Sequence, residues 1–293
     1  MAASGVPASP STMSAYHAPA SLDAALELLA LKPDALVVAG GTEAVRRLRG
    51  GMQDTRPIIA LSGLEELRGI EGTSAGRIRI GALVTCTDIA SSPLIAERAP
   101  ILAQAARSVG GPQIRNCATV GGNIAVRCPR SDLLPPLLAL DAIVTLESRG
   151  KARQLSLAAY VAETALSPEL LTFIECDAAP RGTCFLRMSP RKSLGPAIVN
   201  VAVLLLPAAN GMRWERVRIA LGGVAGAAMR PQRAEAILSV APCAGEELVT
   251  ATAAAAAAAQ EESTPQSDVW ASEWYRRHIT GVLVRRAIAA ACT

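Results

Sequence analysis

Hydrophobic and polar positions along the first half of the chain alternate between helical and strand-like spacing. Ser21 can cap a helix over Leu22–Leu31, where apolar residues recur at helical spacing. A longer helical pattern, interrupted by prolines, covers Thr87–Ala106. Strands are predicted over Ala35–Ala39, Pro57–Leu61, Arg77–Gly81, Ala142–Glu147 and Leu170–Glu175, with further helices over Glu43–Arg49 and Asp132–Leu140 and a turn around Ser148–Arg153.

The second half of the chain has a different order, in which strands come first and helices follow. This order favours an α+β fold. The best linker candidate is Asp177–Gly182, so we expect a flexible extension over residues 1–14, a first domain over 15–178 and a second over 182–293. The strands are predicted over Cys184–Arg187, Ile198–Leu206 and Arg216–Leu221, the last two joined through Asn210-Gly211, and the helices over about Arg230–Leu238, Glu246–Glu262 and Ser272–Ala290.

The composition excludes several classes of protein. Hydrophobic residues make up 51% of the 293 residues and charged residues 18%, which excludes a largely disordered chain. The net charge of +4 is mild, and an aromatic content of 3% argues against a protein that stacks nucleic-acid bases. Because His17 and His278 are the only histidines, a histidine-rich metal site or a histidine relay has few candidates.

The cysteines and the apolar runs bear on the compartment. Seven cysteines are scattered without a CxxC pair, which argues for a reducing compartment and against a zinc or iron–sulfur site on this chain. No stretch approaches the roughly 18 apolar residues of a membrane-spanning helix. Residues 1–14 lack the pattern of a secretory signal, so we expect a cytoplasmic protein without a membrane span.

Two Gly-Gly elements are candidates for phosphate binding. Gly40-Gly41-Thr42 follows a predicted strand and opens into a predicted helix, a position where backbone N–H groups can donate to an anion. Thr119–Asn123 (TVGGN) places a hydroxyl and an amide beside the second pair of glycines. Each could instead be an ordinary turn, but two in one half of the chain favour a dinucleotide held between them. A Walker A loop and a GxGxxG site are not supported, since both patterns are missing.

Charged residues surround the second Gly-Gly element. Arg115 could meet phosphate charge, and Asp132 could accept from a ribose or ribityl hydroxyl. The alternative is a solvated charged loop that also includes Arg127 and Arg130. For Cys128, between two of these arginines, a buried and inert thiol is favoured over a thiolate with a lowered pKa.

Longer stretches resemble a known family. The combined motifs closely resemble the FAD-binding medium subunit of the molybdenum hydroxylases, the relatives of carbon monoxide dehydrogenase, xanthine dehydrogenase and 4-hydroxybenzoyl-CoA reductase. The resemblance covers nearly the whole chain from Tyr16. It rests on Ala39–Glu43, Gly110–Ile124, Ser131–Leu140, Ile198–Ala202, Ala220–Ala225 and Tyr275-Arg276.

The resemblance implies a fold and a set of cofactor contacts. It implies an FAD-binding domain in two subdomains (PCMH-type), followed by a small C-terminal domain with a three-stranded antiparallel sheet and helices. No catalytic side chain and no metal ligand are implied on this chain. The implied FAD contacts are Leu36, Val37, Val38, Ala39, Gly40, Gly41, Thr42 and Glu43, then Thr119, Val120, Gly121, Gly122 and Asn123, and finally Val109, Asp132, Leu170 and Arg187.

The resemblance also implies a role in a complex. The chain would pass electrons between FAD and the [2Fe–2S] clusters of a small subunit, with a molybdenum cofactor on a large subunit, in a dimer of heterotrimers without nucleic acid. Arg187, Pro190 and Gly195 depart from residues common in the family, which leaves the electron acceptor open. Two other interpretations remain: a stand-alone FAD oxidoreductase of this fold, and a bridging subunit that no longer binds flavin.

Overall fold

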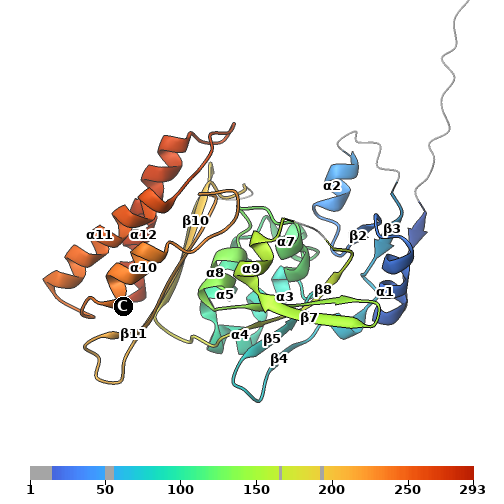
Figure 1. Ribbon diagram of the computed structural model, residues 1–293, viewed down its shortest axis with the longest axis horizontal. Helices are drawn as coiled ribbons and strands as arrows, with labels where there is room; N and C mark the ends of the chain where they lie inside the picture. Colours follow the sequence, from blue (N-terminus) through green and yellow to red (C-terminus); the bar gives the residue numbers. More distant parts are fainter. Residues whose placement is uncertain (1–14, 50–55, 165–166, 192–194) are drawn as a thin grey trace, which may run out of the picture.

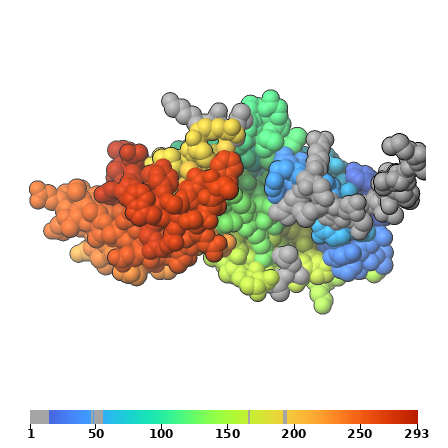
Figure 2. Space-filling view, turned by 90° about the horizontal axis from the view of Figure 1, so that it is seen from above, coloured from blue at the N-terminus to red at the C-terminus, as the bar shows by residue number. Residues whose placement is uncertain are grey.

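The computed structural model describes residues 15–49, 56–164, 167–191 and 195–293, and its elements follow one another along an elongated molecule (Figure 1). Seen from above, the C-terminal domain in orange and the N-terminal subdomain in blue lie on either side of the green middle of the chain (Figure 2). The predicted extension over residues 1–14 and the Gly50-Gly51 end of the second helix lie outside the described residues.

The N-terminal subdomain is a small parallel sheet covered by one helix. Ser21 caps α1 as predicted, accepting from the backbone N–H of Ala24 at 3.2 Å. The strand order is β1-β3-β2, and Leu83 and Leu170 from outside the subdomain complete its apolar core. The elements are β1 (Tyr16–His17), α1 (Leu22–Leu31), β2 (Leu36–Val38), α2 (Ala44–Arg49), β3 (Ile58–Ala60) and the 3₁₀ turn η1 (Glu65–Leu67).

The middle subdomain is an antiparallel five-stranded sheet of order β4-β5-β8-β6-β7 with short helices packed against it. Prolines at the helix starts divide the region after β5 into α3, α4 and α5, as the sequence predicts. The strands are β4 (Ile70–Gly72), β5 (Ile78–Gly81), β6 (Ile143–Ser148), β7 (Lys151–Ser156) and β8 (Leu170–Cys176). The helices are α3 (Cys86–Ser91), α4 (Pro93–Arg98), α5 (Pro100–Ser108), α6 (Pro112–Arg115), α7 (Val120–Ala125), α8 (Leu134–Ala139) and α9 (Leu157–Ala162).

The C-terminal domain is a three-stranded antiparallel sheet with a helical layer on one face, which confirms the predicted fold class. Alternate residues of β10 divide between two cores: Val201 and Val203 face the helices, whereas Ala202 and Leu204 face the middle subdomain, where α8 packs against β10. The elements are β9 (Thr183–Met188), β10 (Val199–Pro207), β11 (Trp214–Gly222), α10 (Gln232–Ser239), α11 (Glu246–Glu262) and α12 (Glu273–Ala291).

Several local predictions differ from the structure. The region around Ser148–Arg153 is a tight hairpin whose second strand is β7, with Gly150 at φ +70° in its turn. The elements β1, β4 and α9 have no counterpart among the predicted strands and helices. Turn residues dominate the sequence between Val109 and Asp132, which predicts no helix there, but the structure has the short helices α6 and α7 in this stretch.

Candidate cofactor-binding site

The two Gly-Gly elements meet in space. We call Ala39–Glu43 the first loop and Thr119–Asn123 the second loop. A Cβ placed on Gly40 would lie 1.7 Å from the carbonyl oxygen of Cys117 and 3.3 Å from Cα of Ala118, so the first loop lies directly against the chain that enters the second loop. The sequence interpretation assigned these glycines to close approach of a ligand. At Gly40 the structure gives another reason, because a side chain there would separate the loops.

The first loop keeps its backbone donors open. Among the residues that the structure describes, none accepts a hydrogen bond from the amide N–H of Gly40, Gly41 or Thr42. Gly41 has a φ of +71°, a conformation that residues with a Cβ rarely adopt. The loop is half-buried, as is β2 before it, which carries the predicted contacts Leu36, Val37 and Val38. Such a run of unpaired N–H groups is suited to an anionic ligand.

The second loop is closed by its own protein contacts. The N–H groups of Val120 and Gly121 donate to the carbonyl oxygens of Val84 and Ala82, both at 2.9 Å. The side chain of Thr119 caps α7 by accepting from Gly122 N–H at 3.1 Å. The N–H of Asn123 donates to the carbonyl oxygen of Thr119 at 2.9 Å.

The second loop can therefore offer a ligand the exposed surface at Gly122 and the side chain of Asn123, but no open N–H groups from its glycines. Gly122 is exposed, and a Cβ there would meet only Thr119 Oγ1, at 3.0 Å. Oδ1 of Asn123 is buried and has no hydrogen-bond partner within the described part of the chain. A buried acceptor without a donor costs free energy, so this amide is free to meet a bound group.

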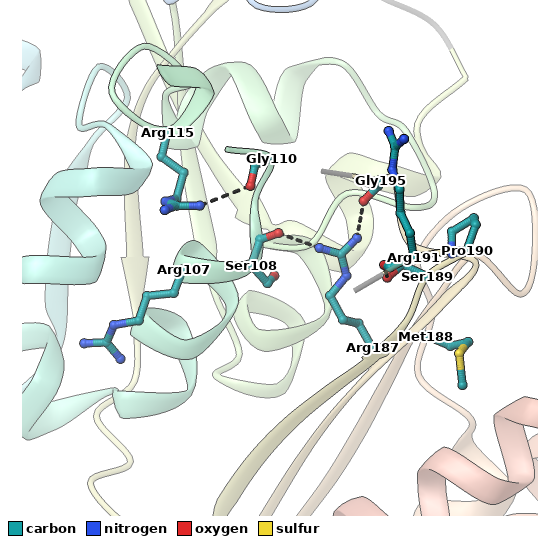
Figure 3. A pocket seen from close by; sticks show the side chains of 10 residues that line it. All are labelled: Arg107, Ser108, Gly110, Arg115, Arg187, Met188, Ser189, Pro190, Arg191 and Gly195. Atoms are coloured by element: carbon teal, nitrogen blue, oxygen red, sulfur yellow. Dashed lines mark hydrogen bonds between the residues drawn. The ribbon is translucent and has the colours of Figure 1, made fainter. Parts of the chain in front are cut away.

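A cavity of about 640 Å³ lies between the middle subdomain and the C-terminal domain (Figure 3). Its most frequent lining residue is arginine, which makes the cavity attractive to an anion. Arg115 donates to the carbonyl oxygen of Gly110 at 3.1 Å, and Arg187 donates to the carbonyl oxygens of Ser108 and Gly195 (Figure 3). The lining residues are Arg107, Ser108, Gly110, Arg115, Arg187, Met188, Ser189, Pro190, Arg191 and Gly195.

The cavity and the loops share one segment of chain. Arg115 lines the cavity, and Cys117, two residues later, contacts the first loop. The three positions that depart from the family pattern, Arg187, Pro190 and Gly195, all line the cavity. The structure therefore joins the two loops to the cavity and places the departures from the family in the cavity rather than in the loops.

Asp132 lies buried where the two domains meet. Its Oδ1 accepts from Asn200 Nδ2 at 2.9 Å, and its Oδ2 lies 3.3 Å from Arg187 Nη1. Burial raises the pKa of Asp132 to about 6, although Arg187 and hydrogen bonds from Asn200 and Ser108 act in the opposite direction. Asn200 is not among the predicted site residues. Its signal was a single polar residue within the apolar run of β10.

The remaining predicted FAD contacts lie in three different surroundings. Val109 is half-buried at the end of α5, and its carbonyl oxygen accepts from Arg115 at 3.3 Å, beside the cavity. Leu170 begins β8 and is buried in the N-terminal core with Leu83, so the structure does not bring it into the cavity lining. Glu43 pairs with Arg46 of α2 at 2.7 Å.

The charged residues after the second loop are engaged rather than freely solvated. Arg127, at φ +48°, lies 4.2 Å from the ring centre of Tyr160 and donates to the carbonyl oxygen of Glu163. Arg130 lies 3.4 Å from Asp268 of the C-terminal domain. Neither side chain lines the cavity.

The described residues contain neither a metal centre nor a membrane-spanning helix. In that part of the chain, no three histidine, cysteine or acidic side chains lie close enough to hold a metal ion. Within the same ranges no helix is long and apolar enough to cross a membrane.

Comparison with protein families gives two matches that together span most of the chain. Residues 11–175 match the family described as the FAD binding domain in molybdopterin dehydrogenase. Residues 185–291 match the CO dehydrogenase flavoprotein C-terminal domain. Both Gly-Gly loops fall in the first match, and the C-terminal sheet falls almost wholly in the second.

Individual relatives match over nearly their full length. The chain is 32% identical to the nicotine 6-hydroxylase medium subunit of Paenarthrobacter nicotinovorans, over 94% of this chain and 96% of the relative. It is 31% identical to the carbon monoxide dehydrogenase medium chain of Hydrogenophaga pseudoflava, over 94% and 96%. Among solved structures, carbon monoxide dehydrogenase from Hydrogenophaga pseudoflava matches with a TM-score of 0.87 and 30% identity, over 96% of this chain and 98% of that one. Quinoline 2-oxidoreductase from Pseudomonas putida 86 matches with a TM-score of 0.85 and 28% identity, over 95% and 96%.

Proposed function

The chain belongs to the FAD-binding medium subunits of the molybdenum hydroxylases, and from this premise we propose that it holds FAD and passes electrons between [2Fe–2S] clusters of a partner subunit and an external acceptor or donor. It is thus a subunit of an oxidoreductase. The observation that supports the proposal most directly is the contact of Gly40 with Cys117, which joins an open phosphate-binding loop to the arginine-lined cavity between the domains.

The residues present fit FAD. The unpaired N–H groups of Gly40, Gly41 and Thr42 would donate to the diphosphate, and the unpartnered Oδ1 of Asn123, an acceptor, would accept from a hydroxyl of FAD beside the second loop. Val109 and Arg187 lie at or beside the cavity and are proposed as contacts nearer the flavin. Asp132 and Leu170 stay predicted contacts, since the first already has two protein partners and the second lies in a core.

FAD, when bound, supplies the redox chemistry, since a flavin exchanges electrons singly on one side and in pairs on the other. The chain would bind and orient it and adjust its electrostatic surroundings through arginines such as Arg115 and Arg187. No side chain is assigned as a general acid or base. Substrate chemistry would take place at a molybdenum cofactor on a large partner subunit.

The assembly follows from the same premise. We propose a large molybdenum subunit and a small [2Fe–2S] subunit as partners, in a cytoplasmic dimer of heterotrimers. The names of two relatives, a medium subunit and a medium chain, support the presence of other chains. We also propose domain limits of 15–178 and 182–293, which nearly coincide with the matched segments 11–175 and 185–291.

The test is a visible absorption spectrum of the purified chain, followed by chromatography of the flavin that acid releases. The chain is prepared alone and co-expressed with its partners. FAD near one equivalent in either preparation supports the proposal. A colourless protein in both, which also takes up no added FAD, would favour the bridging subunit. Turnover of a substrate by the chain alone would favour the stand-alone oxidoreductase.

A further inference from the structure

The apolar helix α8 lies between two aspartates that both pair with arginines of the C-terminal domain. Asp132 precedes the helix and pairs with Arg187 of β9. Asp141 follows the helix and pairs with Arg218 of β11 and with Arg230. We propose that Asp141 is a positioning residue, which sets the C-terminal sheet against α8 and so places Arg187 on Asp132. The inference rests on the proposed function, because that function gives the placement of Arg187 its consequence.

Asp141 is held from three sides. Its Oδ2 accepts from Arg218 Nε at 3.0 Å, and its Oδ1 accepts from Arg230 Nη1 at 2.8 Å. Its backbone carbonyl oxygen accepts from Arg77 Nη2 at 3.0 Å. Its φ of +46° lies in the left-handed region, where aspartate and asparagine are tolerated better than most residues. The carboxylate is about one-third exposed, so its attraction for the arginines is only partly screened.

A second carboxylate extends the contact across the domain boundary. Asp177 accepts from Arg77 of the middle subdomain and from Arg216 of β11. Arg77 therefore bridges the two aspartates, with Nη1 on Asp177 and Nη2 on the carbonyl oxygen of Asp141. One end of β11 is thus held at two neighbouring points.

Arg230 is itself held in place on the C-terminal side. Buried Glu235 accepts from Arg230 Nε at 2.8 Å and from Nη2 at 2.7 Å, and it also accepts from the N–H of Ile219 on β11 at 2.9 Å. Burial lowers the pKa of Arg230, but Glu235 and Asp141 outweigh this effect and raise it. Arg230 therefore presents a permanent charge to Asp141.

The balance of charges in this network depends on Asp141. The network contains four arginines and three carboxylates, namely Arg77, Arg216, Arg218 and Arg230 with Asp141, Asp177 and Glu235. Without the charge of Asp141, four partly buried guanidinium groups would face two carboxylates. Their repulsion would push β11 away from α8.

The sheet connects this network to the cofactor site. Arg218 of β11 lies opposite Leu204 of β10, and Asn200, further along β10, lies opposite Arg187 of β9. Between these points, Ala202 and Leu204 are fully buried in the core that contains α8. Because strands hydrogen-bonded in register move together, a displacement at Arg218 reaches Arg187.

The experiment uses Asp141→Asn in the full chain purified with its partners. Asparagine tolerates the same backbone conformation, so the substitution removes charge and little else. We expect the FAD dissociation constant to rise about tenfold and the visible circular dichroism of the bound flavin to change. Glu261→Gln is the control for loss of a carboxylate charge, since Glu261 pairs with Arg233 at 3.0 Å on the exposed surface of the C-terminal domain. It should alter neither measurement.

A double-substitution cycle with Arg187→Gln separates positioning from general stability. Among the described residues no hydrogen bond or ion pair joins Asp141 to Arg187, so coupling between them must pass through the domain placement. We expect the combined effect on FAD affinity to depart from additivity by about threefold or more. Additive effects, or a lower melting temperature with unchanged FAD affinity and dichroism, would overturn the inference.

A further variant guards against failure to fold. If Asp141→Asn yields no folded protein, Arg218→Gln removes the same ion pair from the other side. Because it leaves three arginines facing three carboxylates, we expect a smaller rise in the FAD dissociation constant, of about threefold, with the same contrary results. If the unsubstituted complex holds no FAD, the proposed function is wrong and the inference falls with it. If that complex holds FAD and the cycle is additive, the inference alone is wrong.

Discussion

The first and second loops share a Gly-Gly sequence and differ in almost every physical respect. In the first loop, the N–H groups of Gly40, Gly41 and Thr42 have no acceptor within the described residues. In the second, the N–H groups of Gly121 and Gly122 are both taken by protein acceptors. The same dipeptide therefore makes an open anion site in one place and a capped helix start in the other.

The difference teaches what each glycine is for. Gly40 and Gly121 are required by protein neighbours, since a Cβ would lie 1.7 Å from Cys117 O in the first case and 2.6 Å from Ala82 Cβ in the second. Gly41 and Gly122 have no such backbone neighbour, so they are the glycines that can face a ligand. Each loop thus pairs one glycine that holds the fold with one that is free for binding.

The largest effect is expected from Gly40→Ala, which attacks the contact between the loops. The new Cβ forces the loops apart, and we expect a loss of about 3 kcal/mol in the free energy of unfolding together with loss of bound FAD. Urea unfolding and the released-flavin assay measure the two effects. Gly69→Ala is the control, because a Cβ at Gly69 meets nothing within 4 Å. Equal stability of the two variants would show that the loops do not depend on this contact.

The next effect concerns Asp132, whose carboxyl has a raised pKa because it is buried. Its folded-state pKa of about 6 exceeds the unfolded value near 4, so the folded chain binds the proton more tightly. This contribution to stability is fully present below pH 4 and is lost as the pH rises through 6, by about 3 kcal/mol in total. In Asp132→Asn this part of the pH dependence should disappear.

The measurement is the difference in unfolding free energy between the FAD-free wild type and Asp132→Asn, taken from pH 4 to pH 7. The difference isolates Asp132 from the other carboxylates, which titrate in both proteins. We expect the variant to gain relative to the wild type as the pH rises. A difference that stays constant would mean that the carboxyl of Asp132 keeps an ordinary pKa.

The third prediction concerns the two glycines that can face a ligand. Gly41→Val and Gly122→Val should each weaken FAD binding by about a hundredfold, because both place a branched side chain where the backbone of the loop is proposed to contact the ligand. Gly41→Val should also lower stability, since Gly41 has a φ of +71°. Gly122→Val should lower it less, because a Cβ there meets only Thr119 Oγ1.

The control for Gly41 matches its positive φ, and the control for Gly122 is a glycine with open space around it. Gly76 has a φ of +78° and Gly226 an ordinary φ, and a Cβ at either meets nothing within 4 Å. Gly76→Val should reproduce the strain of Gly41→Val without loss of FAD, and Gly226→Val should be neutral. Stoichiometric FAD in both Gly41→Val and Gly122→Val would rule out binding between the two loops.

The sequence was sufficient for what depends on local pattern. The strand before Gly40, the proline-divided helices α3 to α5 and the α11 span Glu246–Glu262 all agree with the structure, because their periodicity and turn residues are local. The start of α7 was missed because two glycines are poor helix formers. There, the carbonyl oxygens of Val84 and Ala82, which are distant in sequence, stabilise the helix.

The site was predictable only in part for the same reason. The Gly-Gly elements and Asp132 could be found from the local sequence, and the family resemblance added Arg187. The contact between Gly40 and Cys117 and the hydrogen bond from Asn200 to Asp132 join residues far apart along the chain. Local pattern carries no information on such pairs, which depend on how the subdomains pack.

The smallest effects are expected from the two threonines of the loops. Substitution of Thr119 should lower mainly the stability, and substitution of Thr42 should weaken mainly FAD binding. Thr119 caps α7, so Thr119→Ala should cost about 1 kcal/mol of unfolding free energy in the FAD-free chain. Thr42 makes no side-chain hydrogen bond within the described residues, so Thr42→Ala should leave unfolding within about 0.5 kcal/mol of wild type. Its hydroxyl is open to a ligand, and its loss should weaken FAD binding by about fivefold. Urea unfolding and FAD titration of both variants provide the measurement. If Thr42→Ala lost stability while Thr119→Ala did not, the first loop would be the closed one, and the contrast between the loops would be wrong.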